Sequence, residues 1–600
     1  MRQIKSGALS DPRLGSGAEG VQMIDKRSRS AGTPGVSLAL TGSGGTGVMT
    51  AGNILLEAAA RAGWYGLMVR SSGPQIRGGE AAALMRFSAR PLECLDDRFD
   101  VLIGLDWQNI HRFADEIPID SSSVVVGDPD QGNTPEIFAK HGPTQAGVPF
   151  KQMAKAIPGS WPNMIVLGVA AAFVGLPADA VKSVVRKSHR GDALAASLAA
   201  VDAGVAAAQA LPAMRRAPPP GRAEVPRWLI SGNEAAACGA LRGGVRFVAG
   251  YPITPATEML EWLAPALSEL GGALVQAEDE LASINMIIGA SFGGVPALTA
   301  TSGPGLALMT EALGLAVAAE IPIVVVDVMR GGPSTGIPAK SEQGDINIAV
   351  SGLHGDAPRV VVAPNSVADC LTATQWAVHL AETMQVPAIV LSDQFLGQTR
   401  AVVDRPGDVS FNTERKTAPA RADAYRRYAI TESGISPMAI PGTPGVPYTA
   451  EGLVHNERGV PSSQSSDHVL QLDKRERKLR LHDYGERWAE VEGEGDIAVV
   501  TFGSCTGPVR EALARAEEDG VKARMVSIRL LSPVQPERLA KALEGVKRVL
   551  VVEQNHSGQF HRYLRADYEL PGFVRSLRRP GPLPIRPDEI YREVIEWSRA

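Results

Sequence analysis

Short apolar runs recur along most of this chain, and each is followed by a glycine- or proline-rich turn and then by a helical stretch. Runs without polar alternation are typical of parallel strands that are covered by helices on both faces. The clearest runs lie at 36–41, 101–105, 297–301, 323–328 and 497–501. The sequence therefore predicts an α/β fold built around parallel sheets.

The length of 600 residues exceeds what one hydrophobic core usually supports, so we expect several domains. Residues 1–35 mix charged residues with Ser and Gly and contain no apolar stretch, which predicts a disordered extension. The expected divisions are a first α/β domain at 36–214, a proline-rich linker at 215–227, a second α/β domain at 228–402, an irregular connecting segment at 403–490 and a third, small α/β domain at 491–600.

The composition argues against several classes of function. The net charge is −5, and no basic excess indicates nucleic acid as a partner. No apolar stretch is long enough to predict a membrane span, and the first residues lack a secretory signal, so we expect a cytoplasmic protein without a membrane role. The four cysteines lie more than a hundred residues apart without a CxxC pair, which predicts no metal or iron–sulfur site in this chain.

A glycine-rich turn, TGSGGTGV at 41–48, joins the first predicted strand to a helix. Backbone N–H groups and the helix dipole can bind an anion there. NAD is disfavoured because a dinucleotide site needs an acidic residue about twenty positions later, whereas the next strand ends VRSS at 69–72. A different phosphate-bearing ligand, a subunit contact and a structural turn stay open, and QIRGGE at 75–80 is equally common in surface loops.

Three further motifs follow strands of the second predicted domain, where open α/β sheets bind ligands. In GYPITP at 250–255, two prolines make a rigid turn that can present the Thr254 hydroxyl, although such a turn also occurs without a function. TATSGPG at 299–305 can line a polar pocket with the hydroxyls of Thr301 and Ser302. Arg330 starts another such loop and suits a carboxylate ligand, with a local ion pair as the alternative.

An acidic segment, AEDE at 277–280, opens a predicted helix. Acidic residues in a first turn usually complement the helix dipole, and this suffices for Glu278 and Asp279. The residues three, four and seven positions after Glu280 are Ser283, Ile284 and Ile287. Because this face is small and apolar, we expect the Glu280 carboxyl to be buried, where it can share a proton with a bound heterocycle or serve a structural role.

Taken in order, the motifs GSGGTGV, QIRGGE, GYPITP, AEDE, TATSGPG, RGGPSTG and VEQNHSG resemble a fused gamma and alpha subunit of the 2-oxoacid:ferredoxin oxidoreductases, most closely the 2-oxoglutarate type. The resemblance covers residues 36–600. It implies a gamma-type α/β domain, a second domain that binds the pyrimidine half of thiamine diphosphate, and a transketolase-C-like third domain. The implied reaction converts 2-oxoglutarate, coenzyme A and oxidised ferredoxin to succinyl-CoA, carbon dioxide and reduced ferredoxin, or the reverse.

The same resemblance implies a separate beta subunit that carries the diphosphate site, Mg²⁺ and a [4Fe–4S] cluster. This chain fits that division, because it lacks clustered cysteines and the GDG motif that is followed about two dozen residues later by Asn. Substrates other than 2-oxoglutarate remain open, namely pyruvate, branched-chain 2-oxoacids and arylpyruvates. A non-catalytic nucleotide-binding scaffold is the alternative from another class.

The resemblance also assigns roles to single residues. Glu280 resembles the glutamate that hydrogen-bonds N1′ of the cofactor, Thr254 the threonine near the reacting carbonyl, and Arg330 the arginine that binds the substrate carboxylate. The remaining residues expected around the cofactor are Tyr251, Pro252, Ile253, Thr301 and Ser302.

Overall fold

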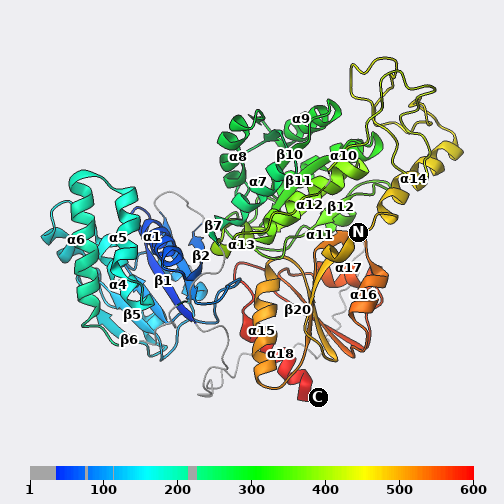
Figure 1. Ribbon diagram of the computed structural model, residues 1–600. Coiled ribbons are helices and arrows are strands. Elements are labelled where there is room, and N and C mark those ends of the chain that lie inside the picture. The colour runs from blue at the N-terminus through cyan, green and yellow to red at the C-terminus, as the bar shows by residue number, and fades with distance from the viewer. Residues whose placement is uncertain are drawn as a thin grey trace, which may run out of the picture.

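The computed structural model describes residues 35–73, 79–112, 114–213, 220, 226–411 and 413–599. The chain forms three sheets of eight, seven and five strands, each covered by helices, which confirms the α/β fold. Figure 1 shows the first sheet at one side of the molecule and the other two sheets together at the other side. Residues 1–34 of the expected extension, most of the proline-rich linker and residues 75–78 of QIRGGE lie outside the described residues.

The first sheet has the strand order β6-β5-β4-β1-β3-β2-β14-β7. Strands β1, β4, β5 and β6 pair in parallel, which agrees with the apolar runs predicted at 36–41 and 101–105, whereas β2 and β3 form an antiparallel pair beside β1. The strands are β1 (Gly35–Ser43), β2 (Tyr65–Ser72), β3 (Glu80–Ser88), β4 (Val101–Gly104), β5 (Val124–Gly127), β6 (Thr144–Gly147), β7 (Arg227–Ser231) and β14 (Arg400–Asp404). The helices are α1 (Val48–Arg61), α2 (Glu136–Ala139), α3 (Phe150–Ala156), α4 (Pro162–Val174), α5 (Ala178–Ser188) and α6 (Gly191–Ala208).

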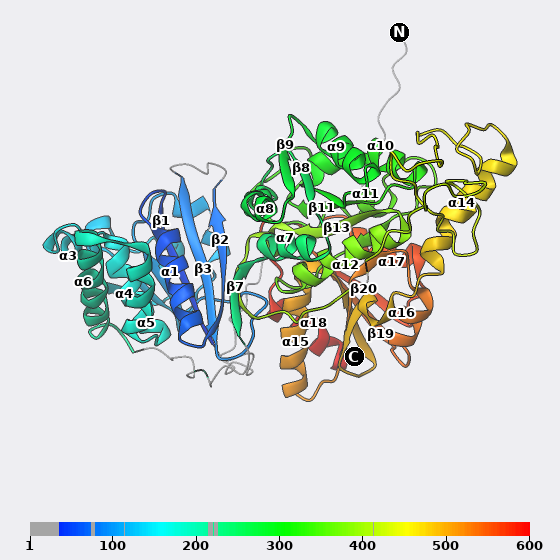
Figure 2. The same cartoon turned by 45° about the horizontal axis from the view of Figure 1, so that its top comes forward.

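Strands β7 and β14 join the first sheet although they flank the second one in sequence. Figure 2 shows β7 beside the first sheet, where that sheet meets the second. The edges of the sheets therefore differ from the expected divisions, which placed 228–402 in one domain. Composition marks a proline-rich linker, but it contains no information on which sheet the next strand will join.

The second sheet has the order β18-β12-β13-β11-β10-β8-β9, and only β18 is antiparallel to its neighbour. Its strands are β8 (Phe247–Gly250), β9 (Ala273–Gln276), β10 (Ala297–Thr301), β11 (Ile323–Met329), β12 (Val360–Val362), β13 (Pro387–Asp393) and β18 (Leu530–Ser532). Its helices are α7 (Gly232–Arg242), α8 (Thr257–Glu269), α9 (Glu280–Phe292), α10 (Gly303–Ala318), α11 (Ile346–Ser351), α12 (Asp369–Met384) and α13 (Gln394–Gln398).

The third sheet has the order β15-β17-β16-β19-β20 and includes the strand predicted at 497–501. Its strands are β15 (Ala489–Glu492), β16 (Ile497–Thr501), β17 (Arg524–Ile528), β19 (Arg548–Glu553) and β20 (Phe573–Arg578). Its helices are α15 (Thr506–Glu518), α16 (Pro536–Ala542), α17 (Gln559–Asp567) and α18 (Pro587–Arg599). Because β18 belongs to the second sheet, this part of the chain is tied to the second sheet by strand pairing.

The segment after β14 is irregular up to residue 464, as expected, but it then forms helix α14 (Ser465–Arg480). The expectation of an irregular connection through residue 490 was therefore wrong for its last part. An apolar period is absent from α14 because its buried face carries charge: Lys474 and Lys478 both pair with Glu320, which is fully buried at the end of α10.

Helix α6 is the one described helix that is long and apolar enough to cross a membrane by length and composition. It packs against α4, where Gly168 and Gly204 allow the two backbones to approach closely. A Cβ on Gly168 would lie 3.0 Å from the Cα of Gly204. This packing buries one side of α6, which includes Ala200, Val201 and Gly204.

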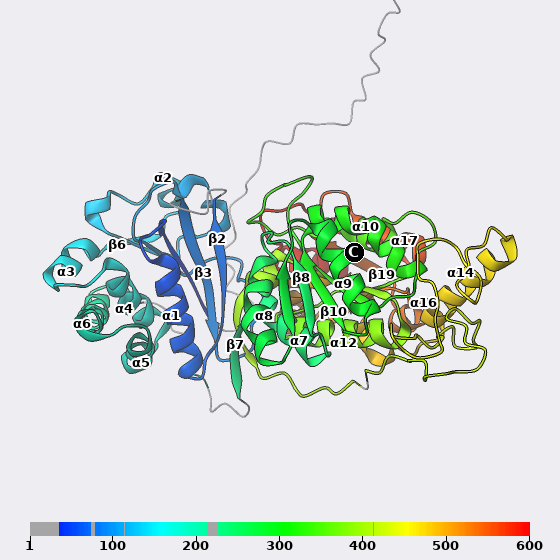
Figure 3. The same cartoon turned by 90° about the horizontal axis from the view of Figure 1, so that it is seen from above.

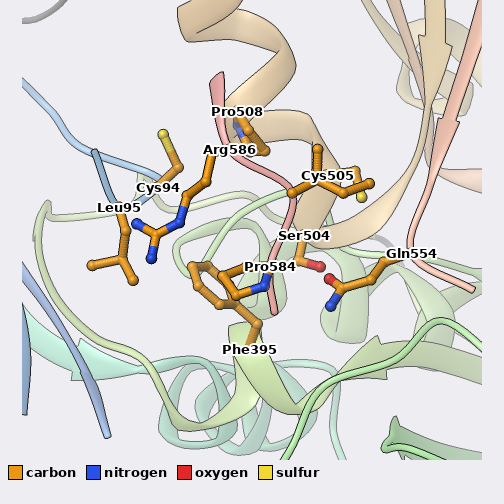
Figure 4. A pocket seen from close by; sticks show the side chains of 10 residues that line it. Cys94, Leu95, Phe395, Ser504, Cys505, Pro508, Gln554, Pro584 and Arg586 are labelled. Atoms are coloured by element: carbon orange, nitrogen blue, oxygen red, sulfur yellow. The ribbon is translucent and has the colours of Figure 1, made fainter. Parts of the chain in front are cut away.

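A buried charge network joins the first sheet to the third. Arg86 of β3 lies 2.6 Å from Glu511 of α15, and Arg515 lies 2.6 Å from the other oxygen of the same carboxylate. A small cavity next to this network is lined by side chains from all three parts of the molecule (Figure 4). They are Cys94, Leu95, Phe395, Ser504, Cys505, Pro508, Gln554, Pro584, Ile585 and Arg586. None of the site residues predicted from the sequence lines this cavity.

Replacing Glu320 with Gln should destabilise the protein by about 3–5 kcal/mol, because two buried ammonium groups would lose their counter-charge. Burial alone would raise the pKa of Glu320, but Lys474, Lys478 and Arg427 together hold it below its ordinary value. Urea unfolding of the variant measures the change. As a control, Glu494→Gln removes an exposed partner of Lys522 and should leave the unfolding midpoint unchanged. Equal midpoints for both variants would contradict this role of Glu320.

Candidate functional site

The predicted loops meet at the point where the second sheet reverses its strand order. The chain runs from β8 outward to β9, and from β10 in the opposite direction to β11, while β8 and β10 lie side by side. All four strands are parallel, so their carboxyl ends lie at one edge of the sheet. Ligand sites of open α/β sheets form at such a reversal. The structure therefore brings the four predicted loops to one place.

Glu280 begins α9 and is 7% exposed, which agrees with the predicted buried face. The residues Ser283, Ile284 and Ile287 behind it are fully buried. Its carboxyl lies against the first turn of α10, because a Cβ on Gly305 would lie 2.7 Å from Glu280 Oε1 and would clash with Thr301 Oγ1. Glycine at 305 is thus required for the close approach of this carboxyl.

Arg330 and Thr254 are in direct contact. Arg330 is 7% exposed, and its Nη1 donates a 2.6 Å hydrogen bond to the carbonyl oxygen of Thr254. Its Nη2 donates to the carbonyl oxygen of Thr335 at 2.9 Å. The buried Nε has no hydrogen-bond partner among the described residues. Burial lowers the pKa of Arg330, and nearby Asp345 opposes this shift. The unpartnered Nε–H leaves this buried guanidinium a donor for an anionic ligand.

The other predicted residues surround this contact. Tyr251 is 40% exposed and Pro252 is exposed, while Ile253 is half-buried. Thr301 and Ser302 are fully buried at the end of β10. The Ser302 hydroxyl does not cap α10 and has no partner among the described residues. The hydroxyls that were predicted to line a polar pocket at 299–305 are therefore buried.

Sequence reasoning missed two acids in this region, Asp327 and Asp345. It also did not single out Thr299, although that residue begins the predicted TATSGPG motif. Thr299 and Asp327 are fully buried, and none of their side-chain oxygens has a hydrogen-bond partner in the described part of the chain. Asp327 had a signal in the sequence, since it is a lone charge within an apolar strand. Asp345 had no such signal in the sequence, because it lies in the loop between β11 and α11 and reaches this region only in the folded chain.

The glycine-rich turn at 41–48 lies in the first sheet, apart from these loops. Its Ser43 N–H and hydroxyl both donate to the carboxylate of Asp106, at 3.1 and 2.7 Å. The Asp106 carboxylate thus occupies the first N–H group of the turn, where an anionic ligand would otherwise bind. At that position a structural turn is favoured over a phosphate site. Gly44 and Gly45 remain exposed.

Three family models match separate parts of the chain. Residues 37–207 match a model described as pyruvate ferredoxin/flavodoxin oxidoreductase. Residues 238–474 match pyruvate flavodoxin/ferredoxin oxidoreductase, thiamine diphosphate-binding, and residues 495–571 match pyruvate:ferredoxin oxidoreductase core domain II.

Related proteins match over most of their length. The 2-oxoglutarate synthase subunit KorA of Methanothermobacter marburgensis is 35% identical over 374 residues, which are 61% of this chain and 98% of the relative. The alpha subunit of a 2-oxoacid:ferredoxin oxidoreductase from Saccharolobus solfataricus is 30% identical over 590 residues, or 88% of this chain and 93% of the relative. The solved 2-oxoglutarate:ferredoxin oxidoreductase from Magnetococcus marinus, with 2-oxoglutarate, coenzyme A and succinyl-CoA bound, is 36% identical with a TM-score of 0.87, covering 94% of this chain and 99% of that chain.

The Gly305→Ala variant tests the close approach of Glu280. Alanine usually stabilises a helix relative to glycine, but here its Cβ would collide with Thr301 and Glu280, so we expect a loss of about 1–3 kcal/mol. Gly289→Ala is the matched control, because a Cβ on Gly289 of α9 meets nothing within 4 Å. That control should gain up to about 1 kcal/mol. Urea unfolding of both variants checks this, and a stabilising Gly305→Ala would contradict the described contact.

Proposed function

Because this chain belongs to the 2-oxoacid:ferredoxin oxidoreductases, as an alpha subunit, we propose that it works with a beta subunit on 2-oxoglutarate. The complex would convert 2-oxoglutarate, coenzyme A and oxidised ferredoxin to succinyl-CoA, carbon dioxide and reduced ferredoxin, or run in reverse, in the cytoplasm. The observation that carries the proposal is the meeting of Glu280, Thr254 and Arg330 at the strand reversal of the domain that matches thiamine diphosphate-binding proteins.

The residues at the strand ends fit the pyrimidine half of thiamine diphosphate. Glu280 is a buried carboxyl at the mouth of the sheet, and it would share a proton with a ring nitrogen through a hydrogen bond. Tyr251, Pro252, Ile253, Thr301 and Ser302 would surround the ring, and the unpartnered hydroxyl of Ser302 is free to bind a polar atom there. When bound, the cofactor supplies the carbon nucleophile and accepts the electrons that decarboxylation releases.

Arg330 would bind the carboxylate of the 2-oxoacid next to its reacting carbonyl. Its contact with the Thr254 carbonyl oxygen fixes the guanidinium beside the GYPITP turn, where the Thr254 side chain would lie near the oxo group. A guanidinium in a buried position binds a carboxylate more strongly than an exposed one does. The roles of Thr254 and Arg330 are therefore to orient the substrate.

An exposed apolar surface beside the site supports a requirement for a beta subunit. Helix α9 exposes Leu281 and Met286, at 50% and 41%, and Leu308 on the adjoining α10 is 50% exposed. The edge strand β9 adds Val275. Figure 3 looks onto these helices. Contiguous apolar side chains at the surface mark a protein interface, so we assign this face to the beta subunit, which would carry Mg²⁺ and the [4Fe–4S] cluster.

The choice of 2-oxoglutarate rests on the names of the relatives, and pyruvate, branched-chain 2-oxoacids and arylpyruvates are the competing substrates. The assay is coenzyme A-dependent reduction of ferredoxin by this chain, alone and co-produced with its beta subunit. We expect activity with 2-oxoglutarate only in the complex. Preference for another 2-oxoacid would show that this compound, not 2-oxoglutarate, is the substrate. A complex that is inactive on all of them would favour a non-catalytic scaffold.

Glu280→Gln should abolish the proton exchange at C2 of bound thiamine diphosphate, with a loss of roughly 10²–10⁴-fold, because the amide cannot hold the proton. Hydrogen–deuterium exchange followed by NMR measures this rate in the complex. Glu278→Gln is the matched control, since Glu278 is an exposed carboxyl two residues earlier. Normal exchange in the Glu280 variant would exclude it from the cofactor site.

Arg330→Ala should raise KM for 2-oxoglutarate by roughly tenfold to a hundredfold, which is the usual loss for a hydrogen bond to a charged group. Arg330→Lys retains the charge and should recover part of this loss. Steady-state kinetics of the complex distinguish the two variants, and an unchanged KM in Arg330→Ala would rule out substrate binding by this residue.

A further inference from the structure

Asp327 is an acid in a position where a charge is strongly disfavoured. It lies in β11, is fully buried, and both of its carboxylate oxygens lack a hydrogen-bond partner within the described ranges. Its Cα is in register with Thr301 of the parallel strand β10, so the two side chains point to the same face of the sheet. Thr301 lies against Gly305 of α10. Asp327 therefore faces the first turn of that helix.

A second carboxyl reaches the same turn from a loop. A Cβ on Gly303 would lie 2.6 Å from Asp345 Oδ2 and 2.7 Å from Oδ1. Asp345 precedes α11, but its side chain accepts no capping hydrogen bond there, so helix capping does not explain it. Its Oδ2 is enclosed and has no partner among the described residues. The two acids thus meet beneath the N-terminus of α10.

Two hydroxyl groups near the two acids also lack hydrogen-bond partners among the described residues. The hydroxyl of Thr299 is fully buried without a described partner and lies on the same face as Thr301 and Asp327. Ser302, in the turn between β10 and α10, also has an unpartnered hydroxyl. Three buried side chains and the enclosed Oδ2 of the half-buried Asp345 therefore have donors or acceptors that the described residues leave unused, although burying such groups without partners is costly.

The loop that carries Asp345 is fixed by the third sheet. Gln343 and Gln554 exchange hydrogen bonds, with Gln343 N–H donating to the Gln554 carbonyl at 2.8 Å and Gln554 N–H donating to Gln343 Oε1 at 2.9 Å. Asn555 donates to the Gln343 carbonyl at 3.1 Å, and Gln559 donates to the Gly344 carbonyl at 2.7 Å. The VEQNHSG motif therefore holds Asp345 in place.

The charges around the pair have opposing effects. Burial raises the pKa of Asp327 well above its ordinary value, and the neighbouring Asp345 raises it further. Burial and Glu342 raise the pKa of Asp345 to about 6, while Arg330 opposes them. The titratable and charged groups that face the pair are Arg330 after β11, Glu280 of α9, and Glu342 with its neighbour His556. Two buried carboxyls that lie together cannot both be ionised at low cost.

We propose that Asp327 and Asp345 share one proton at neutral pH and that the single negative charge left on the pair neutralises Arg330 until an anionic substrate binds. The second part rests on the proposed function. When the substrate carboxylate binds Arg330, the pair takes up a proton from solvent, so the site keeps its net charge. The pair thereby sets how binding of an anionic 2-oxoacid depends on pH.

Infrared difference spectra of the full chain test the shared proton without any assay of activity. With ¹³C-labelled aspartate in D₂O, the wild-type protein should show the carbonyl band of a protonated aspartic acid at neutral pH. Asp327→Asn and Asp345→Asn should each change this band, whereas Asp356→Asn, at an exposed loop position, should not. Absence of the band in the wild-type protein, which needs no variant, would overturn the proposal.

The pH dependence of KM tests the link to the substrate in the complex with the beta subunit. Above a pH of about 6, ionised Asp345 competes with the substrate for Arg330, so wild-type KM should rise by up to tenfold per pH unit while kcat changes less. Asp345→Asn stays uncharged, and its KM should remain nearly constant. An unaltered slope in that variant overturns the link. A wild-type complex inactive on every 2-oxoacid would instead refute the proposed function, and the infrared spectra would still decide whether the proton is shared.

Discussion

The parallel pairing of β8, β10 and β11 is the constraint on which the candidate site depends. It sets the ends of three strands side by side, and the reversal of strand order leaves the turn after β8 facing the turn after β10. Arg330 then joins these loops through its hydrogen bond to the Thr254 carbonyl. A guanidinium that is only 7% exposed needs such hydrogen-bond partners. The sheet places the Thr254 carbonyl next to Arg330, and Arg330 in turn holds the two loops together.

The site is also a product of more than one sheet. The loop between β11 and α11 folds on itself through a bridge between Gly331 and Ile337, and its last part is held by Gln554 and Asn555 of the third sheet. Lys340, in the same loop, pairs with Glu116 from the first part of the chain. A loop attached at both sides in this way positions its acids and amides as firmly as a strand does. Residues from three separate parts of the sequence thus belong to one arrangement.

The apolar runs predicted the parallel strands well, because a strand buried on both faces must be apolar throughout. The burial of Glu280 followed from its own helix, since Ser283, Ile284 and Ile287 are local neighbours. Asp345 and α14 were missed for the opposite reason. Asp345 meets Gly303 only through a long loop, and α14 buries lysines against Glu320 from a distant helix. Periodicity reports local burial, but it does not report which remote charge will be paired. The roles of Glu280, Thr254 and Arg330 in catalysis remain predictions.

Strands β7 and β14 belong to the first sheet, and this affects the order in which that sheet can form during synthesis. Strand β14 lies between β2 and β7, and it follows the whole run from β8 to α13 in sequence. During synthesis, the N-terminal strands leave the ribosome first, but their sheet lacks an inner strand until residue 404 has emerged. The edge of β2 is exposed for that interval, and an unpaired edge can pair with other chains. The first sheet therefore cannot be completed before most of the second sheet has been synthesised. The two sheets are thus not independent folding units.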